Sequence, residues 1–158
     1  MTLLWKCQID DMKWRTFLWL CTALLLSFVL TVYFLFFHCT NVEGIKISGL
    51  LRAGSLKEGH QYCKMLKRSL KSDKSSLKEF STLGIYDAAS YDHGAILVKV
   101  ICRIGADNYL QAIDGVSDEE INAIEAFLRA GIEYGSVEDS LCVNSLIQEV
   151  LSELDKKK

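Results

Sequence analysis

Cysteine and histidine are the residues of this sequence whose spacing most readily suggests chemistry. His60 lies three residues before Cys63, which would place both side chains on one face of a helix. With His93, Cys102 or Cys142 supplied from elsewhere in the fold, such a mixture of ligands could bind zinc. No C-x-x-C pair accompanies them, however, and an oxidising compartment favours disulfides over thiolate ligands. We therefore predict neither a metal nor another cofactor.

A cysteine nucleophile is the second chemistry that these residue types allow. His93 could activate a thiolate, with Asp92 or Asp87 orienting the imidazole, but no local signature of such an enzyme surrounds them. No phosphate-binding loop, carboxylate pair or metal-ligand spacing stands out elsewhere in the sequence. We therefore predict a protein that is not an enzyme.

The cysteines are better explained as structural residues. Of the six, Cys7 lies in the N-terminal tail, Cys21 within a long apolar run, and four lie beyond that run. In an oxidising compartment these four would form disulfides, with three pairings available. Because Cys39 lies so close to the apolar run, we expect it to be left over or to crosslink a homodimer. At least one intramolecular bridge is predicted among the other three, Cys63, Cys102 and Cys142.

The apolar run covers residues 16–37 and reads TFLWLCTALLLSFVLTVYFLFF, without a charged residue. As a helix rising about 1.5 Å per residue, it would span the roughly 30 Å hydrocarbon core of a bilayer. Trp14, Trp19 and Tyr33 lie near its ends, where amphipathic rings prefer the headgroup level. The alternative is a cleaved signal peptide, but the run is too long and FFHCTNVEG offers no A-x-A-like site. We predict a retained signal-anchor in the lipid bilayer.

Positive residues on the two sides of the run predict its orientation. Lys13 and Arg15 adjoin it, whereas the first cation on the far side is Lys46. Because cations close to a span are retained in the cytoplasm, we expect a cytoplasmic N-terminus and an extracytoplasmic C-terminal domain, periplasmic in a bacterium. The predicted divisions are a tail at 1–15, a transmembrane helix at 16–37, a linker at 38–54 and a helical domain at 55–158.

Small residues recur within the predicted span. Ala23, Ser27 and Thr31 are four residues apart and would form a stripe along which a second helix could approach closely. The alternative is an ordinary lipid-facing helix that happens to contain small residues.

Helix starts in the C-terminal domain share one signature. A serine followed three residues later by an acidic residue can satisfy free N–H groups at a helix N-terminus, in a capping box. The chain contains no proline, which fits helices joined by Gly and Ser turns. The candidate boxes are Ser55 with Glu58, Ser76 with Glu79, Ser117 with Glu120 and, in a weaker form, Ser136 with Asp139.

Apolar spacing predicts helices after the last two boxes. The segment after Ser117 has apolar residues at helical spacing as far as Leu128, and Gly131 should follow its end. The last segment should place Val137, Leu141 and Leu154 along one buried side.

Residues 94–104 are harder to assign, because GAILVKVICRI is rich in β-branched residues and could be a buried strand. Asp92, Lys99 and Arg103 nevertheless fall within one narrow helical stripe, which leaves the apolar residues to face inward. We predict a helix here.

The predicted fold is therefore mainly α, with one N-terminal transmembrane helix followed by a small helical bundle. The alternative is an α+β domain with one or two short strands, since Ile45 and Ile47 alternate with polar residues.

Charge limits the partners that this chain can have. The formal net charge of −2 argues against nucleic acid, which requires a basic excess. The second half of the chain is acidic, whereas cations recur at helical spacing before it and would suit anionic lipid or an acidic protein surface. This basic stripe contains Lys64, Lys67, Arg68, Lys71, Lys74 and Lys78.

Together these features predict a membrane-anchored, non-enzymatic module that binds another protein. An immunity or inhibitor protein that acts on the extracytoplasmic side is its most concrete version, by analogy of size and architecture. The alternative is an accessory subunit that docks into a larger membrane assembly through its transmembrane helix.

Overall fold

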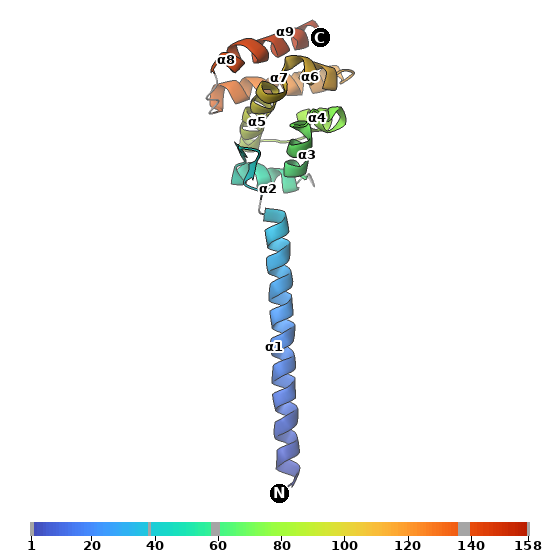
Figure 1. Ribbon diagram of the computed structural model, residues 1–158, viewed down its shortest axis with the longest axis vertical. Helices are drawn as coiled ribbons and strands as arrows, with labels where there is room; N and C mark the ends of the chain where they lie inside the picture. The colour runs from blue at the N-terminus through green and yellow to red at the C-terminus, as the bar shows by residue number, and fades with distance from the viewer. Residues whose placement is uncertain (1, 38, 58–60, 136–139, 158) are drawn as a thin grey trace. The chain divides into compact units, whose positions relative to one another are not determined.

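The computed structural model describes residues 2–37, 39–57, 61–135 and 140–157 of the chain (Figure 1). It divides into two compact units, Met1–His38 and Cys39–Lys158. The described part is mainly helical with one short two-stranded sheet, so the predicted helical class is confirmed and the strands of the alternative are also present.

The first unit is a single helix, α1, which spans Thr2–Phe37. Two of its threonine hydroxyls bond within the helix: Thr22 donates to the main-chain oxygen of Trp19 and Thr31 to that of Ser27. Residues 16–37 are thus helical, as predicted. Among the described residues, however, no helix combines the length and apolar character needed to cross a membrane.

The second unit begins with a β-hairpin, in which β1 (Asn41–Val42) pairs antiparallel with β2 (Ile45–Lys46). Glu43 and Gly44 make the two-residue turn, both with positive φ, as a type I′ hairpin turn requires. The Asn41 side chain supports the turn by accepting a hydrogen bond from the Gly44 main-chain N–H at 2.8 Å.

The expectation of a linker at 38–54 is wrong for the residues that the structure describes. Val42, Ile45, Ile47 and Leu51 are all buried in the core, and the segment continues directly into α2 (Gly49–Lys57). The alternation of isoleucines was therefore the informative signal, because it places both side chains on the core face of a strand.

The remaining helices pack around this start. They are α3 (Tyr62–Ser69), α4 (Lys74–Ser81), α5 (Ala88–Ile104), α6 (Ala106–Ala112), α7 (Asp118–Tyr134), α8 (Ser140–Cys142) and α9 (Gln148–Lys156). A π-helical turn, Val143–Ile147, joins α8 to α9. Within this unit, Figure 1 shows α2 at one end and α7 and α9 at the other.

Helix α5 is the centre of the core and confirms the helical assignment of residues 94–104. Leu97, Val98, Val100 and Ile101 are fully buried along it. Their burial against neighbouring helices outweighs the weak helix propensity of β-branched residues. The most extensive helix contact in the described residues is between α5 and α7.

Of the predicted capping boxes, the one at Ser117 is confirmed and those at Ser76 and Ser55 are wrong. Ser117 and Glu120 form the complete box at the start of α7. Ser76 instead lies inside α4, whose N-cap is Asp73, and the Asp73 carboxylate accepts a hydrogen bond from the Ser76 N–H at 2.8 Å. Ser55 lies inside α2, where its hydroxyl donates to the Arg52 oxygen. The box at Ser136 falls outside the described residues.

Two further details of the predicted helices are corrected. Gly131 does not follow the end of α7 but lies buried within it. Leu141 does not face the core and is 80% exposed, while its neighbour Cys142 is buried. At about 100° per residue, Leu141 lies well away from the side that Ile147, Val150 and Leu154 bury, so helical spacing does not place it on that face.

Candidate functional site

An open groove lies between the hairpin and α5. Residues 44–48 form one wall and the side of α5 from Asp92 to Arg103 forms the other, with Tyr134 and Gly135 at the end of α7 also lining it. The groove encloses about 920 Å³, which is within the usual size of ligand sites.

Polar contacts hold the hairpin segment to α5 at two separated points. The Ser48 hydroxyl donates to the Asp92 carboxylate, and it also accepts a hydrogen bond from the Leu51 N–H at the start of α2. Eleven residues further along α5, Arg103 Nη1 donates to the Glu43 main-chain oxygen at 2.8 Å. The groove is the space left between these two attachments.

Cations dominate the charge of the groove. Lys46 projects from β2, whereas Lys99 and Arg103 belong to α5. Arg103 has a long ion pair with Glu43, at 3.9 Å, but neither lysine has an ion-pair partner within the part of the chain that the structure describes. The Asp92 carboxylate keeps its negative charge when Ser48 donates to it, so the groove is lined by three cations and one carboxylate and has an excess of positive charge.

An exposed aromatic pair adjoins the groove. Tyr91 of α5 and Tyr134 of α7 meet edge to face with ring centroids 5.0 Å apart, and they are 47% and 65% exposed. A hydrogen bond to Glu133 raises the pKa of Tyr134. Exposed tyrosine next to a charged groove is typical of protein-binding surfaces.

The histidine that the sequence offered for chemistry is a core residue. His93 is fully buried, and its Nδ1 lies 2.9 Å from the Tyr62 hydroxyl oxygen. The rings of Phe80 and Phe127 pack edge to face against the imidazole, with ring centroids 4.9 and 5.0 Å from its centroid. Burial lowers the pKa of His93 to about 3, although the Phe80 main chain opposes the shift. Burial also raises the pKa of Tyr62, so this pair is neutral.

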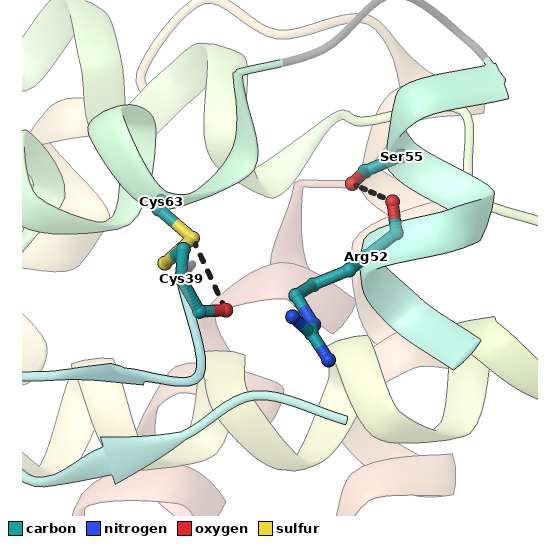
Figure 2. The surroundings of a disulfide bond; sticks show 4 residues. All are labelled: Cys39, Arg52, Ser55 and Cys63. Atoms are coloured by element: carbon teal, nitrogen blue, oxygen red, sulfur yellow. Dashed lines mark hydrogen bonds between the residues drawn. A yellow bond between two sulfur atoms is a disulfide. The ribbon is translucent and has the colours of Figure 1, made fainter. Parts of the chain in front are cut away.

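Disulfides account for the cysteines beyond α1, as predicted for a disulfide-bonded domain. Cys102 pairs with Cys142 across 5.7 Å between Cα atoms, which ties α5 to α8. Cys39, expected to be left over, pairs with Cys63 of α3 across 6.3 Å. Figure 2 shows this second bridge near Arg52 and Ser55 of α2. The expectation for Cys39 was wrong because residues 39–54 fold into the domain, which brings Cys39 against α3.

These pairings leave the suggested zinc and nucleophile arrangements unassembled. Cys63, Cys102 and Cys142 carry no free thiol, and His93 faces aromatic rings. His60 lies outside the described residues. The described residues contain no group of three or more His, Cys, Asp or Glu side chains placed to hold a metal ion.

The basic stripe is divided between exposed and tethered cations. Lys64, Lys67, Arg68 and Lys71 are exposed on α3 and the turn after it. The other two reach across to the segment around α6: Lys74 donates to the Gln111 side chain at 3.3 Å and Lys78 to the Gly115 oxygen at 3.1 Å.

The small-residue stripe of α1 lies on the surface of its own unit, where Ala23, Ser27 and Thr31 are all exposed.

The groove was not foreseen from the sequence, although part of its signal was visible. The Asp92, Lys99 and Arg103 stripe served only as evidence for a helix, yet it is the wall of the groove. What the pattern could not reveal is that a hairpin about 50 residues earlier would lie opposite that stripe.

Comparison of the chain with protein-family models, with curated proteins and with solved structures finds no match.

Proposed function

We propose that this chain is a membrane-anchored, non-enzymatic module that binds another protein through the groove between its hairpin and α5. The observation that carries the proposal is the pair of lysines, Lys46 and Lys99, without ion-pair partners in the described fold and beside the exposed Tyr91 and Tyr134 pair. Tyrosine is enriched among the residues that contribute most to protein–protein binding, and unpaired positive charge beside it would attract an acidic partner.

The anchor is proposed on the sequence of residues 16–37, which contain no charged residue. Several large apolar side chains of α1 support it, because Leu24, Leu25, Leu26 and Phe28 are each more than 60% exposed. An exposed apolar helix surface requires either lipid or protein to cover it. Lys13 and Arg15 before the run place the second unit outside the cytoplasm in this proposal.

The disulfides agree with that location. Bridges such as Cys39–Cys63 and Cys102–Cys142 persist in oxidising compartments and are rare in the cytosol. A reporter fused after Lys158 should therefore be active only on the extracytoplasmic side. Activity confined to the cytoplasm would contradict the proposed orientation.

Photo-crosslinking tests the binding role directly. A benzoylphenylalanine in place of Tyr134 should give one discrete protein adduct in native membranes, because that ring lines the groove. The matched control is the same replacement at Tyr86, which is 71% exposed but is not among the groove residues. No adduct from Tyr134, or the same adduct from Tyr86, would overturn the proposal.

Exchange of the anchor separates this role from that of an accessory subunit. If residues 16–37 are replaced by an unrelated transmembrane helix, the adduct from Tyr134 should persist. Its loss would instead indicate that α1 itself docks into a larger membrane assembly.

A further inference from the structure

We infer that the groove binds an extended, acidic segment of the partner protein, with its carboxylates held between Lys46 and Lys99 and its main chain alongside β2. This inference rests on the proposed function and names the chemistry of the segment that the groove accepts.

Charge selects an acidic segment. Lys46 and Lys99 stand on opposite walls of the groove, on β2 and α5, and Arg103 lies further along the same wall as Lys99. A carboxylate that enters between the two lysines would form charge-assisted hydrogen bonds to both walls. Lys99 is only partly exposed, so bonds to it are less weakened by solvent than those on an open surface.

The length of the groove fits an extended chain. The wall from Asp92 to Arg103 covers eleven helical steps, or roughly 16 Å at about 1.5 Å per residue. An extended segment advances about 3.3 Å per residue, so about five residues would fill the groove.

The edge of β2 provides main-chain groups for such a segment. Ile47 donates a main-chain hydrogen bond to Thr40 at 2.9 Å, and Asn41 stands opposite Lys46 in the next position of the register. Because hydrogen-bonded and non-hydrogen-bonded pairs alternate in an antiparallel ladder, the N–H and C=O of Lys46 point away from β1. Residues 44–48 line the groove, so a strand added there would lie within it.

Shape favours a protein segment over a membrane surface. A bilayer presents headgroups in a plane, whereas Lys99 of α5 is only partly exposed and lines a groove opposite the hairpin. The exposed part of the basic stripe, including Lys67 and Lys71 on α3 and the turn after it, is a second cationic surface and lies outside the groove residues. Those two lysines supply a matched control, since their replacement removes the same charge outside the groove.

The test uses the full chain in a non-ionic detergent and a fluorescent, end-blocked peptide of about five residues that alternates glutamate with valine. The unmodified chain should bind this peptide and not its glutamine counterpart. The Lys46→Gln/Lys99→Gln variant should bind at least about tenfold more weakly, whereas Lys67→Gln/Lys71→Gln should change affinity less than about twofold.

Three results would overturn the inference. They are failure of the glutamate peptide to bind the unmodified chain, equal binding of the glutamine peptide, and equal weakening by the two double variants. Glycerol phosphate, the headgroup chemistry of phosphatidylglycerol, provides a further arm: binding of it that is lost in Lys46→Gln/Lys99→Gln, without peptide binding, would make the groove a lipid-headgroup site. The Tyr134 cross-link does not depend on these peptides, so failure of the inference and failure of the proposed function remain distinguishable.

Discussion

The side of α5 that meets α7 and the side that meets the β-hairpin differ in how closely their neighbours approach. At the α7 contact, a Cβ added to Gly94 would lie 2.0 Å from the Phe127 oxygen, and one added to Gly131 would lie 2.3 Å from the Gly94 carbonyl carbon. On the other side, an open groove separates the hairpin from α5, and Lys46 and Lys99 line it.

Sequence position explains how one helix carries both surfaces. At about 100° per residue, Gly94 lies nearly opposite the stripe formed by Asp92, Lys99 and Arg103. Glycine within a helix costs about 1 kcal/mol relative to alanine, so its presence in both α5 and α7 indicates a packing requirement. Long charged side chains face the hairpin, and the contacts that join the hairpin segment to this side of α5 are the polar ones made by Asp92 and Arg103.

In the proposed function, stability and binding therefore depend on different sides of α5. The α7 side has no room for a substituent, whereas the hairpin side has room for a ligand. Substitutions on the two sides should therefore differ in kind: those at the glycines should affect folding, and those at the lysines should affect binding.

The Gly94→Ala/Gly131→Ala variant tests the side of α5 that packs against α7 and should have the largest effect on stability. Both added methyl groups would meet main-chain atoms, which cannot move without separating α5 from α7. We expect the free energy of unfolding to fall by more than about 4 kcal/mol. Urea denaturation followed by near-ultraviolet circular dichroism measures this, because Tyr62 and Tyr109 are buried in the core.

Gly49→Ala is the control for that measurement. Gly49 begins α2 at a φ that any residue adopts, and a Cβ there would meet only the end of the Arg52 side chain, at 3.8 Å. Its unfolding free energy should change by less than about 0.5 kcal/mol. A double glycine variant as stable as this control would show that the two helices can separate cheaply.

The disulfides should come next in size. Cys102→Ala/Cys142→Ala releases α5 from α8 and should lower the unfolding free energy by about 2 to 4 kcal/mol. Cys39→Ala/Cys63→Ala opens a shorter loop, with a separation of 24 residues against 40, so its chain-entropy effect should be smaller by about 0.5 kcal/mol. The same denaturation experiment compares the two variants, and the reverse order would show that native packing outweighs loop length.

Local sequence signals predicted the helices of this fold better than they predicted the contacts between them. The capping box at Ser117 needs only residues within one helical turn, and the charged stripe on α5 needs only helical geometry. The start of α4 was missed because two caps compete within four residues: Asp73 receives the N–H of Ser76, the residue that was expected to be the cap itself.

Features that depend on distant residues could not be predicted. The sequence around Gly131 is typical of a helix end. Gly131 instead lies within α7, where it packs directly against Gly94 of α5, a residue 37 positions earlier in the chain. The contact of Arg103 with Glu43 joins residues 60 positions apart. The groove depends on that contact, so no local pattern could have indicated it.

Acid should lower the free energy of unfolding through His93, by less than the loss of a disulfide at most and by more than the lysine substitutions below. The folded state holds this imidazole neutral with a pKa of about 3, whereas in the unfolded chain the pKa is about 6.5. The unfolded state therefore binds more protons below pH 6.5, and stability falls as the pH decreases from there toward 3. We expect a loss of about 2 kcal/mol at pH 5 from this residue.

The control for the acid effect is His93→Gln, whose side chain can still bond to the Tyr62 hydroxyl but does not titrate. Urea midpoints of this variant should change little between pH 6.5 and pH 5, the interval that lies above the ordinary pKa values of carboxyl groups. An equal pH dependence in the variant and the unmodified chain would assign the effect to other groups.

The smallest stability effect should come from the hairpin side of α5. Lys46→Gln/Lys99→Gln removes two cations that have no ion-pair partner in the described fold, so the unfolding free energy should change by less than about 0.5 kcal/mol. Arg103→Gln is the comparison, because it breaks the hydrogen bond to the Glu43 oxygen and should cost about 1 kcal/mol. Both are measured by urea denaturation of the full chain. If the lysine variant lost as much stability as the arginine variant, the lysines would be part of the hairpin attachment, and the open side of α5 would be a structural contact like its closed side.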